Sequence, residues 1–183
     1  IEPGQQVGDV STVNGSVTIG AGARAGEVET VNGSLKIEDK AVVGSAETVN
    51  GSITVGAEAD VQRGVEAVNG SLTLRQGAKV AGGLENVNGS MLVEGARVDG
   101  GIETVNGDIR LATGSHVTGG IHVEETKPSW WKGANSRNPR ITIEQGATVE
   151  GPLHFEREVD LYVAPGVQLP PVQGVQPQRF TLQ

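Results

Sequence analysis

The tripeptide Val-Asn-Gly occurs six times in this chain, and its copies follow one another at intervals of 18 or 19 residues. The asparagines of the six copies are Asn14, Asn32, Asn50, Asn69, Asn88 and Asn106. A period this regular indicates one structural unit that is stacked many times, so most residues of the chain serve the stack. The repeat therefore constrains the architecture strongly and the function weakly.

Apolar residues also recur at fixed positions of the unit, in columns that begin at Val10, Val17 and Ile19. A further apolar column consists of Val13, Val31, Val49, Val68, Val87 and Val105. The residues are largely β-branched and alternate with polar ones, which is typical of strands with one buried face. Glycine and Asn-Gly separate these segments at regular intervals and indicate corners.

Three short strands per unit predict an all-β fold, namely a single-stranded, three-sided parallel β-helix (β-solenoid) with about 18–19 residues per coil. In this fold like residues stack at ~4.8 Å, and the asparagines can form a corner ladder of hydrogen bonds. The glycine after each asparagine would let the corner turn with a positive φ. The alternative is an antiparallel meander, because Asn-Gly between alternating segments is also a strong hairpin signal.

We expect the solenoid over residues 1–170, with regular coils from about residue 8 to 118, an interrupted seventh coil and a looser eighth. The interruption is an insertion at 124–140, and 171–183 is expected to form a C-terminal cap and tail. Proline and charge blunt exposed strand edges, and the C-terminal end is the richer in proline. Self-association into a homo-oligomer or filament is therefore expected through the N-terminal edge.

Composition narrows the classes of partner. A net charge of −8 argues against nucleic acid and anionic membranes as partners. The absence of cysteine excludes disulfides and thiolate chemistry, and no apolar stretch is long enough to predict a membrane span. We expect no cofactor. Because the first residue is Ile1 rather than Met, we expect a removed signal peptide and a periplasmic or secreted protein, with a cytoplasmic one as the alternative.

Three segments, VTIGAGARAGEV (17–28), LTLRQGAKVAGGL (72–84) and ITIEQGATVEGPL (141–153), resemble bactofilins, the polymer-forming bacterial β-helix proteins. This resemblance implies a right-handed, three-sided β-helix that assembles end to end without nucleotide. The Val-Asn-Gly-Ser corner also resembles the repeats of secreted bacterial β-strand-repeat proteins of putative adhesin type. The left-handed hexapeptide helix of acyltransferases has the same 18-residue turn, but Val28 falls one residue early for that pattern, so the right hand is preferred.

One outward column is acidic. It begins at Ser11, continues as Glu29, Glu47, Glu66, Glu85 and Glu103, and ends with His122 and His154. Stacked carboxylates repel one another, and a basic partner or a divalent cation would relieve the repulsion. The alternative is a solvated polar ribbon that salt screens. Because every coil repeats the same residue, we expect no carboxylate of the column to have a separately raised pKa, which argues against an enzyme.

Glu103, His122 and His154 lie at the end of this column, where imidazole and carboxylate groups suit zinc or a similar metal. The alternative is that they are ordinary surface residues.

The insertion holds the chain's only tryptophans, in a basic context: Trp130, Trp131, Lys132 and Arg137 are the predicted partner-binding residues. Exposed tryptophans stack on sugar rings or anchor protein partners, unless they fold back on the solenoid. We expect the basic residues of the insertion to meet the Glu29–Glu103 ribbon, on this molecule or on another. The predicted function is a non-enzymatic structural or self-assembling scaffold at the bacterial cell envelope that displays this loop. A carbohydrate-binding or adhesin module is the alternative, and a β-helix polysaccharide-active enzyme ranks third.

Overall fold

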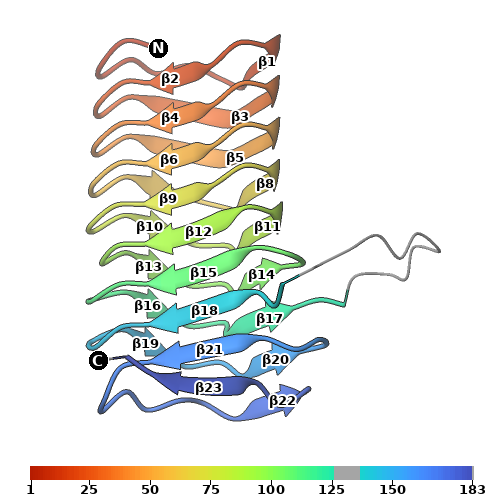
Figure 1. The fold of residues 1–183 in the computed structure, drawn as a ribbon. Helices are drawn as coiled ribbons and strands as arrows, with labels where there is room; N and C mark the ends of the chain where they lie inside the picture. The colour runs from red at the N-terminus through yellow and green to blue at the C-terminus, as the bar shows by residue number, and fades with distance from the viewer. Residues whose placement is uncertain (126–136, 183) are drawn as a thin grey trace, which may run out of the picture.

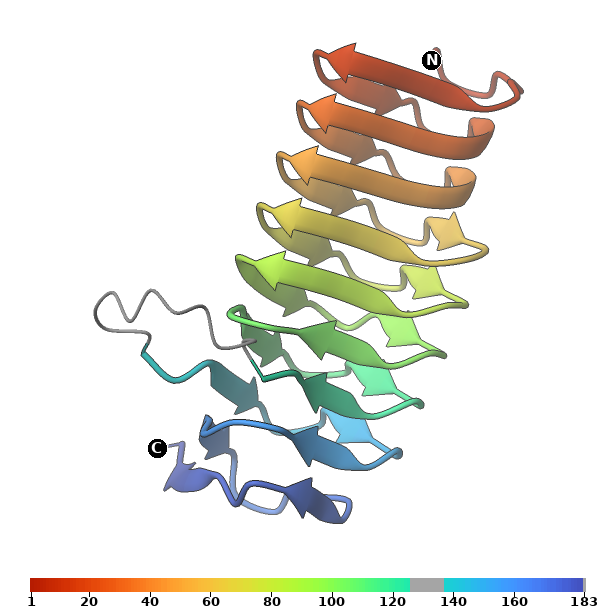
Figure 2. The same cartoon turned by 90° about the vertical axis from the view of Figure 1, so that its right-hand side faces the viewer.

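The chain forms a β-solenoid of about eight coils, in a computed structural model that describes residues 1–125 and 137–182. The paired strands run parallel, as for β1 with β3 and β2 with β4, so the antiparallel meander is wrong. In Figure 1 the chain descends while the front strands run to the left and those behind run to the right. Figure 2 shows the same sense of winding, so the helix is right-handed, as predicted.

The coils stack into three faces. Face 1 comprises β1 (Val10–Asn14), the second halves of β3 (Arg24–Asn32) and β5 (Val42–Asn50), β8 (Val65–Asn69), β11 (Leu84–Asn88), β14 (Ile102–Thr104), β17 (Ile121–Val123), β20 (Leu153–Phe155) and β22 (Val172–Gly174). Face 2 comprises β2 (Val17–Ile19), β4 (Leu35–Ile37), β6 (Ile53–Val55), β9 (Leu72–Leu74), β12 (Ser90–Val93), β15 (Asp108–Leu111), β18 (Arg140–Ile143), β21 (Asp160–Val163) and β23 (Gln178–Thr181). Face 3 comprises the first halves of β3 and β5, then β7 (Asp60–Val61), β10 (Lys79–Val80), β13 (Arg97–Val98), β16 (His116–Val117) and β19 (Thr148–Val149).

A thin aliphatic core fills the space between the faces. Strand β4 shows the pattern, because Leu35 and Ile37 are buried on either side of the exposed Lys36. Burial of each such side chain is worth roughly 1.5–3 kcal/mol, and every coil repeats the gain. Phe155 is the largest fully buried side chain among the residues that the structure describes.

The column that begins at Val13 is not part of the core. Val31, Val49, Val68 and Val87 are 38–40% exposed. The residue before each valine points inward instead: Thr30 and Thr48 are buried, and their hydroxyls donate to the carbonyl oxygens of Gly15 and Gly33 at 3.0 and 3.1 Å. Alternation along the strand puts every second residue outside, so the buried Val28 fixes Glu29 and Val31 on the solvent side.

The predicted asparagine ladder is present. Each asparagine after Asn14 donates its Nδ2–H to Oδ1 of the asparagine one coil earlier, at 3.0–3.2 Å. The adjacent glycines adopt the expected positive φ only in part: φ is positive at Gly70 but not at Gly33. At Gly33 and the later corners, an added Cβ would instead collide with the carbonyl oxygen of the preceding corner glycine.

The insertion leaves the solenoid at this same corner, because β17 ends at Val123 and β18 begins at Arg140. Among the described residues, the ladder ends at Asn106. Arg157, from the eighth coil, reaches back and donates to Oδ1 of Asn106 at 2.8 Å and to the carbonyl of Val105 at 3.3 Å.

The two ends of the stack differ. Segment 171–183, expected as a cap and tail, carries β22 and β23, which pair in parallel with β20 and β21 and add a partial coil. At the other end residues 1–7 pair with the start of β3 and its preceding turn, through bonds such as Val7 N–H to the Arg24 carbonyl. Strand β1 has β3 as its one partner in the described structure, so its outer edge is open. The described part of the chain has no helix that could cross a bilayer.

Candidate functional site: the outer columns of face 1

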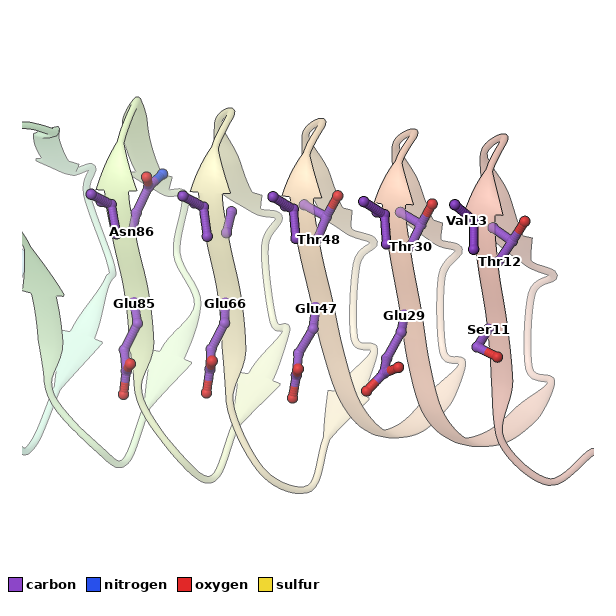
Figure 3. Close-up of a pocket in the computed structure, with 15 residues that line it drawn as sticks. Ser11, Thr12, Val13, Glu29, Thr30, Glu47, Thr48, Glu66, Glu85 and Asn86 are labelled. Atoms are coloured by element: carbon purple, nitrogen blue, oxygen red, sulfur yellow. The ribbon is translucent and has the colours of Figure 1, made fainter.

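The acidic column lies in register on the outside of face 1. Parallel pairing aligns Glu29 with Glu47, Glu47 with Glu66, and Glu85 with Glu103. Two residues farther along each strand lies the exposed valine column. The two columns line a shallow groove of about 550 Å³ across the first five coils, which we call the Glu–Val groove. Figure 3 shows its glutamates in a row on successive strands.

Burial and mutual repulsion raise the pKa of three glutamates in the groove. A hydrogen bond with Glu27 and its charge raise the pKa of Glu29. Burial, followed by the charge of Glu66, raises the pKa of Glu47, and burial with the charge of Glu85 raises that of Glu66. Arg63 offsets part of this charge, since its guanidinium lies 3.3 Å from Glu27 Oε2. The groove therefore favours a cationic occupant.

Both columns change identity at coils 7 and 8. Register pairs Glu103 with His122 and His122 with His154, so histidine replaces glutamate. Because Val123 pairs with Phe155, the next positions, Glu124 and Glu156, continue the valine column as carboxylates. The outer side of face 1 therefore has two parts. Coils 1–5 present glutamates and valines, and coils 7 and 8 present histidines and glutamates.

The second half forms a connected cluster. His122 Nε2 lies 3.1 Å from Glu156 Oε1, and its Nδ1 lies 3.8 Å from Glu103 Oε1. The rings of His122 and His154 meet edge to face with centroids 4.9 Å apart. The backbone N–H of Glu125 donates to Glu156 Oε2 at 3.0 Å. This bond, then that to His122, lowers the pKa of Glu156.

Glu103 differs from the other glutamates of its column. A hydrogen bond with Glu124, then burial and the charge of Glu124, raise the pKa of Glu103 to about 7. The expectation that no carboxylate of the column has a separately raised pKa is therefore wrong. The reason is that Glu103 has a carboxylate neighbour in the next coil where earlier glutamates have a valine.

Sequence reasoning identified Glu103, His122 and His154 but missed Glu124 and Glu156. The signal was present as two copies of one short pattern, Ile-His-Val-Glu at 121–124 and Leu-His-Phe-Glu at 153–156. Both copies place histidine and glutamate two residues apart, on one side of a strand.

Trp130, Trp131 and Lys132 lie outside the described residues. Arg137 makes a bidentate pair with Asp108, at 3.1 and 2.7 Å, which raises the pKa of Arg137. The guanidinium of Arg140 lies 5.0 Å from the ring centroid of Tyr162. Their partners belong to β15 and β21 of face 2, so these two arginines do not meet the Glu29–Glu103 ribbon of their own molecule, and contact with the ribbon of another copy stays a prediction.

No model of a known protein family, no curated protein and no solved structure matches this chain. The resemblance to bactofilins and to β-strand-repeat adhesins stays a prediction.

Proposed function

We propose that the protein is a non-enzymatic, self-associating β-solenoid scaffold in which the insertion of one copy docks into the Glu–Val groove of another. The observation that carries this proposal is the exposed valine column. The solenoid gains no core packing from these valines, since they face solvent at 38–40% exposure in four consecutive coils. A continuous apolar stripe that is exposed to solvent marks an interaction site.

Charge favours the insertion as the occupant. Residues 126–136 read TKPSWWKGANS, with Lys127 and Lys132 on either side of the two tryptophans and no acidic residue. Tryptophans suit the valine column, and the flanking ammonium groups suit the glutamate column two residues away. The groove and the insertion are therefore complementary in both polarity and charge.

Chain length favours docking between copies. The segment is held at both bases, by the Glu125 bond to Glu156 and by the Arg137 pair with Asp108. A segment of this length that returns on itself reaches about 20 Å from its bases. Coils 1 and 2 lie about 24–29 Å from coil 7 at ~4.8 Å per coil. The part of the groove on coils 1 and 2 is therefore accessible only to the insertion of another molecule. Because such a contact joins two different surfaces, each added copy leaves a free groove and a free insertion, and the assembly can grow.

A mixing experiment with two variants tests the proposal. The loop variant carries Trp130→Ala and Trp131→Ala, and the groove variant carries Val49→Thr and Val68→Thr, which keep β-branched side chains on exposed positions. By multi-angle light scattering, wild type should associate with rising concentration and each variant alone should stay monomeric. An equimolar mixture should form a one-to-one complex, because each supplies what the other lacks.

Two outcomes would overturn this function. One is a monomeric wild type at high concentration. The other is two variants that associate as well as wild type. A loop that docks on its own molecule would give monomers in every sample, with tryptophan fluorescence changed in the groove variant. Placement at the cell envelope, glycan binding through the tryptophans and a polysaccharide-active enzyme stay predictions from the sequence.

A further inference from the structure

We propose that His122, His154 and Glu156 bind one divalent transition-metal ion of the zinc class at the surface of coils 7 and 8. The three residues come from adjacent strands, β17 and β20, and from the position directly after β20. One ligand atom from each lies within 4.8 Å of the others. This site is separate from the Glu–Val groove of coils 1–5 and does not depend on the proposed docking.

The donor geometry is close to that of a loaded site. Nitrogen and carboxylate ligands lie ~2.0–2.2 Å from zinc, so donors of a tetrahedral ion stand roughly 3.3–3.5 Å apart. His122 Nε2 and Glu156 Oε1 are already 3.1 Å apart. A rotamer adjustment of His154 completes the set, because the His122 and His154 rings are already in edge contact. Side chains that are 34% and 41% exposed at His122 and Glu156 leave a coordination position open to water.

Neighbouring groups orient these ligands. A metal-binding histidine usually donates its other ring N–H to a carboxylate, which fixes the tautomer. Glu103 is the carboxylate near that nitrogen, with Oε1 3.8 Å from His122 Nδ1, and would have to approach by roughly 0.8 Å to accept the N–H. The backbone N–H of Glu125 holds Glu156 Oε2 and leaves Oε1 directed at the histidine.

The donor set selects the class of metal. Two imidazoles and one carboxylate favour zinc, cobalt or nickel, whereas calcium and magnesium prefer oxygen donors alone. A cluster of Glu103, His122 and Glu124 shares His122 with this site. A further cluster, Glu27, Glu29 and Glu47, has only carboxylates and carries no inference. It provides an internal comparison, since a calcium signal there would be independent of the histidines.

Isothermal titration of the full chain with Zn²⁺ tests the site, with Co²⁺ absorption as a second readout of coordination. We expect one ion per chain and visible bands of a low-coordinate histidine site. His154→Ala and Glu156→Gln should each abolish this binding, and Glu103→Gln should weaken it by about 10–100-fold as an outer-shell partner. Circular dichroism establishes that each variant is folded.

The matched control is His116→Ala. His116 is also paired with a glutamate, Glu150, at 3.0 Å, but it lies in β16 on face 3. This variant should bind Zn²⁺ as wild type does. The proposal fails if wild type binds no Zn²⁺, if His154→Ala keeps its affinity, if His116→Ala loses as much as His154→Ala, or if equimolar Ca²⁺ displaces the ion.

Discussion

Removal of one interior rung of the asparagine ladder should destabilise the protein about twice as much as removal of its first rung. Asn50 takes part in two ladder bonds: it donates to Asn32 at 3.0 Å and accepts from Asn69 at 3.1 Å. Asn14 takes part in one, from Asn32 at 3.2 Å. A net hydrogen bond is worth about 0.5–1.5 kcal/mol, and these side chains are exposed, so water replaces part of what is lost. We expect ~1–2 kcal/mol for Asn50→Ala and ~0.5–1 kcal/mol for Asn14→Ala.

Urea unfolding followed by far-UV circular dichroism measures both variants. The slope against urea should stay that of wild type, which shows that the same surface is exposed on unfolding. Equal losses for Asn50→Ala and Asn14→Ala would refute the reasoning, because the ladder bonds would then not be the source of the effect. A loss below about 0.3 kcal/mol for Asn50→Ala would show that hydration replaces the ladder completely.

Three further predictions concern the corner, the acidic column and the open end. Gly33→Ala should lower the free energy of unfolding by more than about 2 kcal/mol, because its Cβ meets the Gly15 carbonyl. Gly8→Ala is the control: nothing lies near its Cβ, so it should change the free energy of unfolding in urea by less than about 0.5 kcal/mol. Similar values for the two variants would contradict the argument from close approach. The pKa of Glu103 is about 7 in the folded state and has its ordinary value of 4.5 in the unfolded state. The folded state therefore binds the proton more tightly, and stability falls as the pH rises between these two values. With EDTA present, the thermal midpoint should fall from pH 5 to pH 8, and by less in Glu103→Gln; an identical fall in that variant would assign the effect elsewhere. In a chain that lacks residues 127–136, any remaining self-association should join the open β1 edges. Val13→Lys should then make that chain monomeric without unfolding it. If light scattering finds the deletion chain itself monomeric at high concentration, edge pairing is disproved.

The solenoid could be predicted from the sequence because stacked coils require a regular period and similar residues at equivalent positions of each coil. The asparagine ladder and the acidic column followed from the period alone, since like residues one coil apart must be neighbours. Handedness followed from the position of Val28 and from the family resemblance, and the structure confirms it.

The valine column shows where pattern reasoning stops. Its residues are as β-branched and as regular as those of the core, so hydrophobicity gives no sign that Val31 faces solvent. The decisive fact is the inward Thr30, whose hydroxyl is satisfied by the Gly15 carbonyl. A hydrophobic pattern does not reveal a buried polar residue with a backbone partner, and here that residue places the following valine, Val31, on the solvent side.

Contacts across the insertion were also beyond the sequence. The bond from Arg157 to Asn106 spans 51 residues and joins coil 8 to the corner of coil 6, so it links positions on either side of the insertion. The contact between Glu103 and Glu124 has another origin, because it joins the paired strands β14 and β17 before the insertion. It arises since Glu124 stands where the earlier coils have a valine.

The ladder also has an electrical direction. Every amide donates toward the N-terminal end and accepts from the C-terminal end, so the side-chain dipoles align as peptide dipoles do in a helix. Among the described residues the last acceptor of the ladder, at its negative pole, is Oδ1 of Asn106, and the guanidinium of Arg157 donates to it at 2.8 Å. A cation at such a pole is worth ~0.3–1 kcal/mol when exposed. Any stack of this kind therefore needs a donor, and preferably a charged one, below its last rung, and an added coil that ends in a carboxylate at that corner would be repelled.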